Sequence, residues 1–259
     1  MVNVLVTKIM HRFLKEIVSC NLLTLKKYIL FLFLYNSLIY SQTLCKVNYI
    51  VLPTGGTFEN NEDIKKFKTA KYFIGFDEAL KKVNYELVVK NNESFYSQIP
   101  SLDLDNSRID KTAKNLAGSS SFYKKNLEII KIAYLSGETF NVLLNKSNEW
   151  KVTNESKIIN DYLCFKATRE KIANKKVSVQ VIAWFCPKIP INDGPKEFCD
   201  LPGLILELQD GRFTYLASNI DLSKTQKNVI PTPKGEVISE NQYDKILAES
   251  KDKMFSNMR

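Results

Sequence analysis

The chain has 259 residues, 44% hydrophobic and 25% charged, which is typical of a globular protein and excludes a disordered or collagen-like one. The formal net charge is +9, but residues 1–41 carry five basic residues against one acidic residue, so residues 42–259 hold an excess of about +5. Because Lys alternates there with Glu, Asp and Asn, the charge predicts a solvated surface and no nucleic-acid partner.

Residues 26–41 have the layout of a secretory signal peptide. The basic pair Lys26-Lys27 precedes a short apolar run, and polar residues follow up to Ser41. The apolar run is shorter than the ~20 residues that a membrane-spanning helix needs. We therefore expect cleavage after Ser41, with no transmembrane anchor after cleavage.

These boundaries divide the chain into three parts. Residues 1–41 are an N-terminal extension plus signal peptide, residues 42–238 are a single antiparallel-β domain, and residues 239–259 are a charged C-terminal helix. The exported chain is expected in the periplasm, at the outer membrane or outside the cell. Possible partners are an outer-membrane transporter or another envelope protein.

The exported part of the chain lacks histidine, since the single histidine is His11. Sites built on Ser-His-Asp, Cys-His or His-ligated metals are therefore excluded from residues 42–259. Four acidic residues lie close together in sequence, and we interpret them as solvated rather than as cation ligands. They are Asp193, Glu197, Asp200 and Glu207. We assign no metal, no cofactor and no catalytic residue.

The predicted elements alternate apolar and polar residues, as antiparallel strands do. The first strand covers residues 47–52, a short helix lies near 77–82, and one or two strands cover 83–98. Residues 100–125 are polar with a weak helical pattern. A meander follows, with strands at 127–135, 139–144, 150–153, 157–168, 177–184, 204–209 and 213–219. Ser239 and Gln242 form a capping box that predicts the terminal helix.

This order predicts a mainly β fold (α+β), a curved antiparallel sheet or half-barrel meander with a few helices. The architecture resembles that of periplasmic lipoprotein carriers. Aromatic side chains on the strands are candidates for an apolar ligand groove, although aromatic residues on strands more often belong to the core. The candidates are Trp150, Tyr162, Trp184, Phe185 and Tyr215.

Residues 189–203 are a long connection rich in proline and glycine, and rigid loops of this kind often shape a site. Together with Pro187 and Lys188, which lead into it, this connection is the 187–203 loop. We interpret it as a covering loop that seals one end of the sheet, with Leu201 and Leu204 as plugs. Of the four cysteines beyond residue 41, Cys186 and Cys199 flank the loop and are predicted to be bridged, with Cys164 as the main rival partner.

Residues 150–208 resemble the GLPGLI family, an exported family without assigned chemistry, found mostly in the Bacteroidota. Asp200 stands where the family has its first glycine, so the resemblance does not require a special backbone angle there. The residues that carry the family motif are Asp193, Gly194, Pro195, Leu201, Pro202, Gly203, Leu204 and Ile205.

The resemblance implies no activity, and two functions are left open. The first is a non-enzymatic binding or accessory protein of the periplasm or outer membrane that holds an apolar ligand or a partner segment. The second is a hydrolase that uses carboxylates near the 189–203 loop. The absence of histidine favours the first.

Overall fold

The computed structural model describes residues 44–55, 75–100, 107–145, 149–173, 177–222 and 229–256. The predicted signal peptide lies outside these residues. In the described part of the chain, no helix has the length and apolarity needed to cross a membrane.

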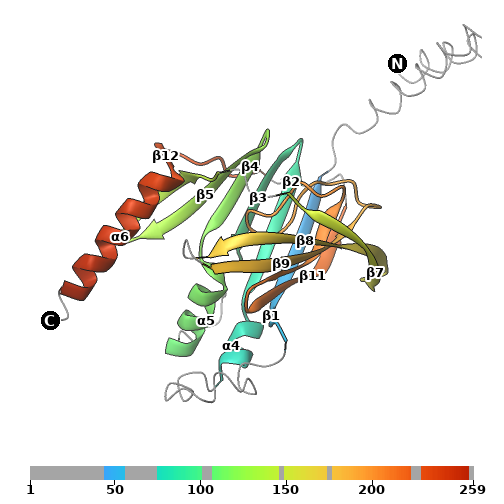
Figure 1. Ribbon diagram of the computed structural model, residues 1–259, viewed down its shortest axis with the longest axis horizontal. Coiled ribbons are helices and arrows are strands. Elements are labelled where there is room, and N and C mark those ends of the chain that lie inside the picture. Colours follow the sequence, from blue (N-terminus) through green and yellow to red (C-terminus); the bar gives the residue numbers. More distant parts are fainter. Residues whose placement is uncertain are drawn as a thin grey trace, which may run out of the picture. The chain divides into compact units, whose positions relative to one another are not determined.

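In the described residues, two antiparallel meanders and one short added strand form one mainly β, open sheet of twelve strands (Figure 1). The first comprises β1 (Cys45–Pro53), β2 (Asn84–Lys90), β3 (Glu93–Gln98), β4 (Ser121–Lys125), β5 (Glu128–Leu135) and β6 (Glu138–Leu143). The second comprises β7 (Lys151–Ile159), β8 (Tyr162–Ala173), β9 (Val177–Cys186), β10 (Leu204–Asp210) and β11 (Phe213–Asp221).

Pairing between β1 and β11 joins the two meanders in the middle of the sheet. A short strand, β12 (Val237–Ser239), adds to β6 in parallel, so the sheet is mixed. The described helices are α4 (Phe76–Lys81), α5 (Arg108–Gly118) and α6 (Glu240–Ser256).

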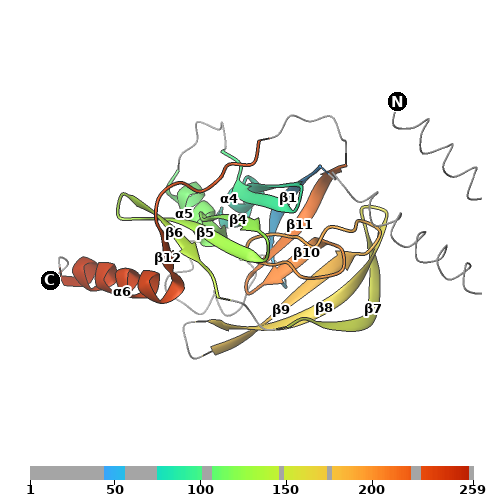
Figure 2. The same cartoon turned by 90° about the horizontal axis from the view of Figure 1, so that it is seen from above.

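The connection between β6 and β7 requires the sheet to curve. The two strands are ten strand spacings apart in the sheet order, or roughly 48 Å in a flat sheet. The seven residues 144–150 span at most about 28 Å. The two ends of the sheet must therefore approach each other, and Figure 2 shows the strands following such a curve. The predicted half-barrel architecture is confirmed, and the sheet is not closed.

Alternation along the strands places one face of the sheet in the core. In β1, Cys45, Val47, Tyr49 and Val51 are fully buried, whereas the residues between them are half-buried. Tyr85 and Tyr96 on the neighbouring strands stack with ring centroids 5.0 Å apart. Aromatic packing of this kind buries a large apolar area on the inner face of the curve.

Two-residue turns with positive φ connect several of the hairpins, because such turns match the right-handed twist of paired strands. Asn91-Asn92 joins β2 to β3, and Asn160-Asp161 joins β7 to β8. The second turn corrects the predicted strand 157–168, which the structure divides between β7 and β8. Residues 121–125 form β4, which the sequence pattern did not predict.

The terminal helix α6 begins as the sequence predicts. The backbone N–H of Gln242 donates to the Ser239 hydroxyl at 3.3 Å, and the Ser239 N–H donates to the Gln242 side chain at 2.8 Å. These reciprocal bonds confirm the capping box.

Gly203 lies against the backbone at the end of β9, and a Cβ atom there would fall 2.2 Å from the Cys186 carbonyl oxygen. We predict that Gly203→Ala lowers the free energy of unfolding by about 3 kcal/mol or more, because backbone must move to admit the methyl group. Gly211→Ala is the control, since it has positive φ but open space around it, and it should cost about 1 kcal/mol. Urea unfolding measures both, and equal losses would contradict the close approach.

Candidate functional site

The 187–203 loop is part of the hydrophobic core. Ile189, Phe198, Leu201 and Leu204 are each at most 2% exposed. The amide of Leu204 donates to the Ile189 carbonyl at 3.0 Å, so the two ends of the loop are tied together. Leu201 and Leu204 are plugs, as expected, but the loop lies between the two meanders rather than over one end of the sheet.

A buried lysine on β4 holds this loop. The Lys124 ammonium group forms an ion pair with Asp193 and donates to the carbonyl oxygens of Gly194 at 3.0 Å and Phe198 at 3.3 Å. Both side chains of the ion pair are about nine-tenths buried, at 8% and 10% exposed. Three bonds from one ammonium group satisfy its donors and fix the loop to the first meander.

The second meander holds the same loop through Phe198. The Arg169 guanidinium of β8 lies 4.6 Å from the centre of the Phe198 ring and 4.7 Å from that of Trp150. The Trp150 indole N–H donates to the Cys199 carbonyl at 2.8 Å. Side chains of both meanders therefore contact the loop: Lys124 binds Asp193, and Arg169 packs on Phe198.

The motif residues have structural roles in this arrangement. Asp193 forms the ion pair, and its carboxylate also accepts the Gly194 N–H at 2.8 Å. A Cβ on Gly194 would meet Ile205 at 2.7 Å. Leu201, Leu204, Ile205 and Pro195 are buried, and Pro202 is exposed. The motif therefore builds the plug and its contacts with the sheet.

Asp200 corrects an expectation from the resemblance. It has φ of 70°, in the left-handed region, so the backbone does take a special angle where the family has glycine. Aspartate is one of the few residues other than glycine that enters this region at moderate cost. Asp200 can therefore occupy this turn without a glycine.

A network of alternating charges lies beside the loop. Lys171 on β8 binds Glu197 at 2.8 Å and Asp210 at 3.3 Å, and Lys196 binds Asp210 at 2.9 Å. Burial alone raises the pKa of the Glu197 and Asp210 carboxyls, but the ammonium groups of Lys171 and Lys196 outweigh burial and hold each pKa below its usual value. Both carboxylates are ionised at neutral pH.

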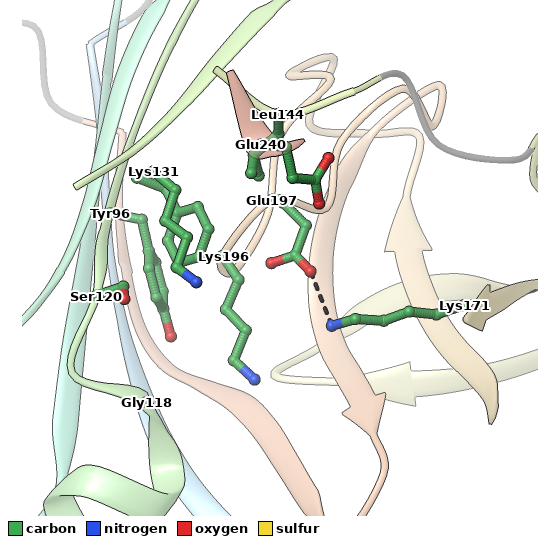
Figure 3. Close-up of a pocket in the computed structure, with 10 residues that line it drawn as sticks. Tyr96, Gly118, Ser120, Lys131, Leu144, Lys171, Lys196, Glu197 and Glu240 are labelled. Carbon is green, nitrogen blue, oxygen red and sulfur yellow. Dashed lines mark hydrogen bonds and ion pairs between the residues drawn. The ribbon is translucent and has the colours of Figure 1, made fainter. Parts of the chain in front are cut away.

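A pocket of about 310 Å³ opens beside this network (Figure 3). Its wall includes charged and hydroxyl side chains from both meanders, the loop and the first turn of α6. The lining residues are Tyr96, Gly118, Ser120, Phe122, Lys131, Leu144, Lys171, Lys196, Glu197 and Glu240. In Figure 3, the ends of Lys131, Lys196, Glu197 and Tyr96 point into the same space.

The aromatic residues predicted to line an apolar groove are not brought together. Tyr215 and Phe185 are core residues, 0% and 2% exposed. Trp184 follows the opposite face of β9, where the Lys157 ammonium lies 4.3 Å from its ring centroid. Tyr162 is half-buried at the start of β8, and Trp150 packs on the loop. These five residues do not form one surface.

The four acidic residues expected to be solvated differ in environment. Asp193 and Glu207 are each 8% exposed, and Glu207 binds Lys157 at 2.6 Å, so for these two the expectation is wrong. Glu197 is half-buried and pairs with Lys171, whereas Asp200 is exposed. In the part of the chain that the structure describes, no three His, Cys, Asp or Glu side chains are placed to hold a metal ion.

Cys186 and Cys199 are both free thiols in this structure, so their bridge stays a prediction. The β8–β9 register that pairs Phe165 with Phe185 places Cys164 opposite Cys186 one step further along. Burial and the neighbouring Cys186 raise the pKa of the Cys164 thiol to about 12. Cys164, the rival partner, is therefore the cross-strand neighbour of Cys186.

Residues 170–207 match a family described as "Protein of unknown function (Porph_ging)", which is associated with the Bacteroidota. No curated protein matches the chain.

Two solved structures have a distant likeness to the fold. "Structure of PNGF-II in P21 space group" is 14% identical with a TM-score of 0.48, covering 80% of this chain and 34% of that one. "Structure of PNGF-II in C2 space group" is 14% identical with a TM-score of 0.46, covering 81% and 33%. The chain thus spans about a third of the length of these structures.

Several residues of the site were not predicted from the sequence. Lys124 and Lys131 have the appearance of surface lysines, and Tyr96 has that of an ordinary core aromatic. For Lys124 the one available signal is its position two residues after Phe122. Residues two apart in a strand lie on the same face, so a buried Phe122 would place Lys124 on the buried face as well.

We predict that breaking the Lys124–Asp193 pair destabilises the fold. Lys124→Met should lower the free energy of unfolding by about 3–5 kcal/mol, because Asp193 is left as an unpaired buried charge. The double variant Lys124→Met/Asp193→Asn should lose less unfolding free energy than the two single variants lose in sum, by roughly 1–3 kcal/mol. Lys125→Met is the matched control, because its pair with Glu93 is partly exposed and should contribute under about 1 kcal/mol. Additive losses would show that the two side chains do not depend on each other.

We also predict an acid-sensitive contribution from Glu197 and Asp210. Their folded-state pKa values lie below the ordinary 4.5 and 3.8, so their stabilisation is complete above those values and is lost as the pH falls through the folded-state pKa. Asp210→Asn should therefore flatten the fall in unfolding free energy as the pH drops below about 4. Glu155→Gln, which removes an exposed carboxylate, is the control. An unchanged slope in Asp210→Asn would contradict the prediction.

Proposed function

We propose that this chain is an exported GLPGLI-type protein of the cell envelope, and that it binds a ligand and a partner without catalysing a reaction. The resemblance of residues 150–208 supports the family, as does the match of residues 170–207 to a family of the Bacteroidota. The signal-peptide pattern of residues 26–41 supports export.

The observation that carries the binding function is the pocket between the loop and both meanders. A pocket of about 310 Å³ is at the lower end of the range for small-molecule sites. Its walls come from strands of both meanders and from Lys196 and Glu197 of the loop, which is bonded to β4 through Lys124. The site is therefore suited to recognition.

The charges around the pocket weigh against the hydrolase alternative. Carboxylate-dependent hydrolysis needs one protonated and one ionised carboxyl at the same pH. Glu197 and Asp210 both have lowered pKa values and pair with Lys171 and Lys196. Both carboxyls are therefore ionised at neutral pH, and neither Glu197 nor Asp210 can serve as the general acid.

The small-molecule ligand that the pocket favours is polar. Five of its ten lining residues are charged, and a wholly apolar ligand loses affinity when it displaces the hydration of such groups. This replaces the expected apolar ligand held by the aromatic residues of the strands. We place the binding of a partner segment at a different surface, the sheet edge formed by β7.

The sheet edge at β7 is the surface that we propose for the partner, an outer-membrane transporter or another envelope protein. β7 is the last strand of the described sheet, and Ile158 on it is 73% exposed. Ile158 pairs in register with Leu163 of β8, which is 52% exposed. An open edge beside an exposed apolar pair suits the addition of a strand from another protein.

The test is affinity capture of the tagged chain from its native envelope after chemical crosslinking. We expect the wild-type chain to begin at Gln42 and to recover an envelope protein, and Ile158→Lys to reduce that recovery at least about tenfold. Tyr134→Lys is the matched control, since Tyr134 is 72% exposed on β5 in the other meander. Equal recovery by both variants, or a chain retained in the cytoplasm, would refute the proposal.

A further inference from the structure

Three ammonium groups line the pocket, and two of them have carboxylate partners. Lys171 pairs with Glu197, and Lys196 pairs with Asp210. Lys131 forms no ion pair with the residues that the structure describes, and its ammonium lies 5.4 Å from the centre of the Tyr243 ring. Lys131 is therefore the one lining ammonium without a direct ion-pair contact among the described residues, and the Glu240 carboxylate lies in the same wall.

The Tyr96 hydroxyl is a second group without a partner. Tyr96 is 0% exposed, and its oxygen has no hydrogen-bond partner among the described residues. Stacking on Tyr85 and edge contact with Tyr49 hold the ring in place. A buried hydroxyl without a partner is costly, and native structures seldom leave one unless a ligand or water completes it.

The surroundings keep this hydroxyl protonated. Burial, with the nearby phenols of Tyr215, Tyr85 and Tyr49 and the Glu197 carboxylate, raises the pKa of Tyr96 well above its usual value. Tyr96 is thus a hydrogen-bond donor at neutral pH. In Figure 3 its hydroxyl, the Lys131 ammonium and the Lys196 ammonium point into one space.

Acceptor oxygens also line the pocket. One Glu197 oxygen accepts from Lys171, and one Glu240 oxygen accepts from the Asn145 side chain at 2.8 Å and its backbone N–H at 3.1 Å. The second oxygen of each carboxylate is available to accept from a ligand hydroxyl. At about 310 Å³, the pocket is larger than a lone inorganic anion requires.

We propose that the pocket binds a small hydroxylated organic anion, whose carboxylate or phosphate group is held by Lys131 and Tyr96 and whose hydroxyl groups donate to Glu197 and Glu240. The inference rests on the proposed binding function and names its ligand class. Carboxylate and phosphate are both anions with several acceptor oxygens. Lys131 offers them a charged donor, and the Tyr96 hydroxyl offers a neutral one.

The experiment is titration calorimetry of the purified chain with gluconate, glucose 6-phosphate, inorganic phosphate and glucose. We expect one or both of the organic anions to bind, and glucose and inorganic phosphate to bind at least about tenfold more weakly. Preference for gluconate identifies a carboxylate head group, and preference for glucose 6-phosphate identifies a phosphate. Absence of binding by both organic anions at millimolar concentration, or equal binding of glucose, would overturn the proposal.

Variants locate the site and separate it from stability. Lys131→Gln should weaken anion binding about tenfold or more, and Lys90→Gln, an exposed lysine on β2, should leave it unchanged. Tyr96→Phe should weaken binding by about fivefold or more with no loss of thermal stability, because it removes a hydroxyl that has no partner in the fold. Unchanged affinity in Lys131→Gln and Tyr96→Phe would overturn the assignment. Envelope capture through β7 reports on the proposed function separately, since neither variant touches that edge.

Discussion

The ammonium group of Lys124 is the contact on which the arrangement of this protein depends. A lysine that is 8% exposed is tolerated only when its charge is paired and its donors are bonded, and Asp193 and two loop carbonyls meet both conditions. These partners all belong to the 187–203 loop. The charge therefore gives the loop one position against β4, which an apolar contact alone, being non-directional, would not do.

The curvature of the sheet explains why such a loop is needed. Because seven residues connect the two distant strands β6 and β7, the sheet bends and its inner face becomes concave. Apolar side chains on that face must be covered, and the loop supplies Ile189, Phe198 and Leu201 for the purpose. Trp150 and Arg169 complete the contact from the second meander.

The pocket follows from the way the loop fills the curve. Its apolar residues occupy the interior, and Lys196 and Glu197 on its far side meet Lys171 and Asp210 from the sheet. The pocket opens beside these ion pairs, and Lys171, Lys196 and Glu197 form part of its wall. None of the motif residues lines the pocket, whereas Tyr96 and Lys131, which lie outside the motif, do.

The sequence by itself determined the features that depend on near neighbours in the chain. The alternation in β1, the strand character of residues 83–98 and the capping box of Ser239 and Gln242 were readable, because strand pleat and helix caps are set within a few residues. Whether 83–98 holds one strand or two was left open, and the structure shows two. The absence of imidazole beyond His11 likewise follows from composition alone. The division of β7 from β8 was missed because Asn160-Asp161 forms its turn with two left-handed residues and no glycine.

Tertiary structure alone decided the candidate site. Lys124 and Asp193 are 69 residues apart, and Tyr96 and Lys131 reach the same pocket from different strands. No local pattern separates a lysine that will be buried from one that will face water, since both sit in the same alternation of polar and apolar residues. The difference arises only when the curved sheet brings the loop and both meanders together, because burial and charge pairing depend on which distant residues become neighbours.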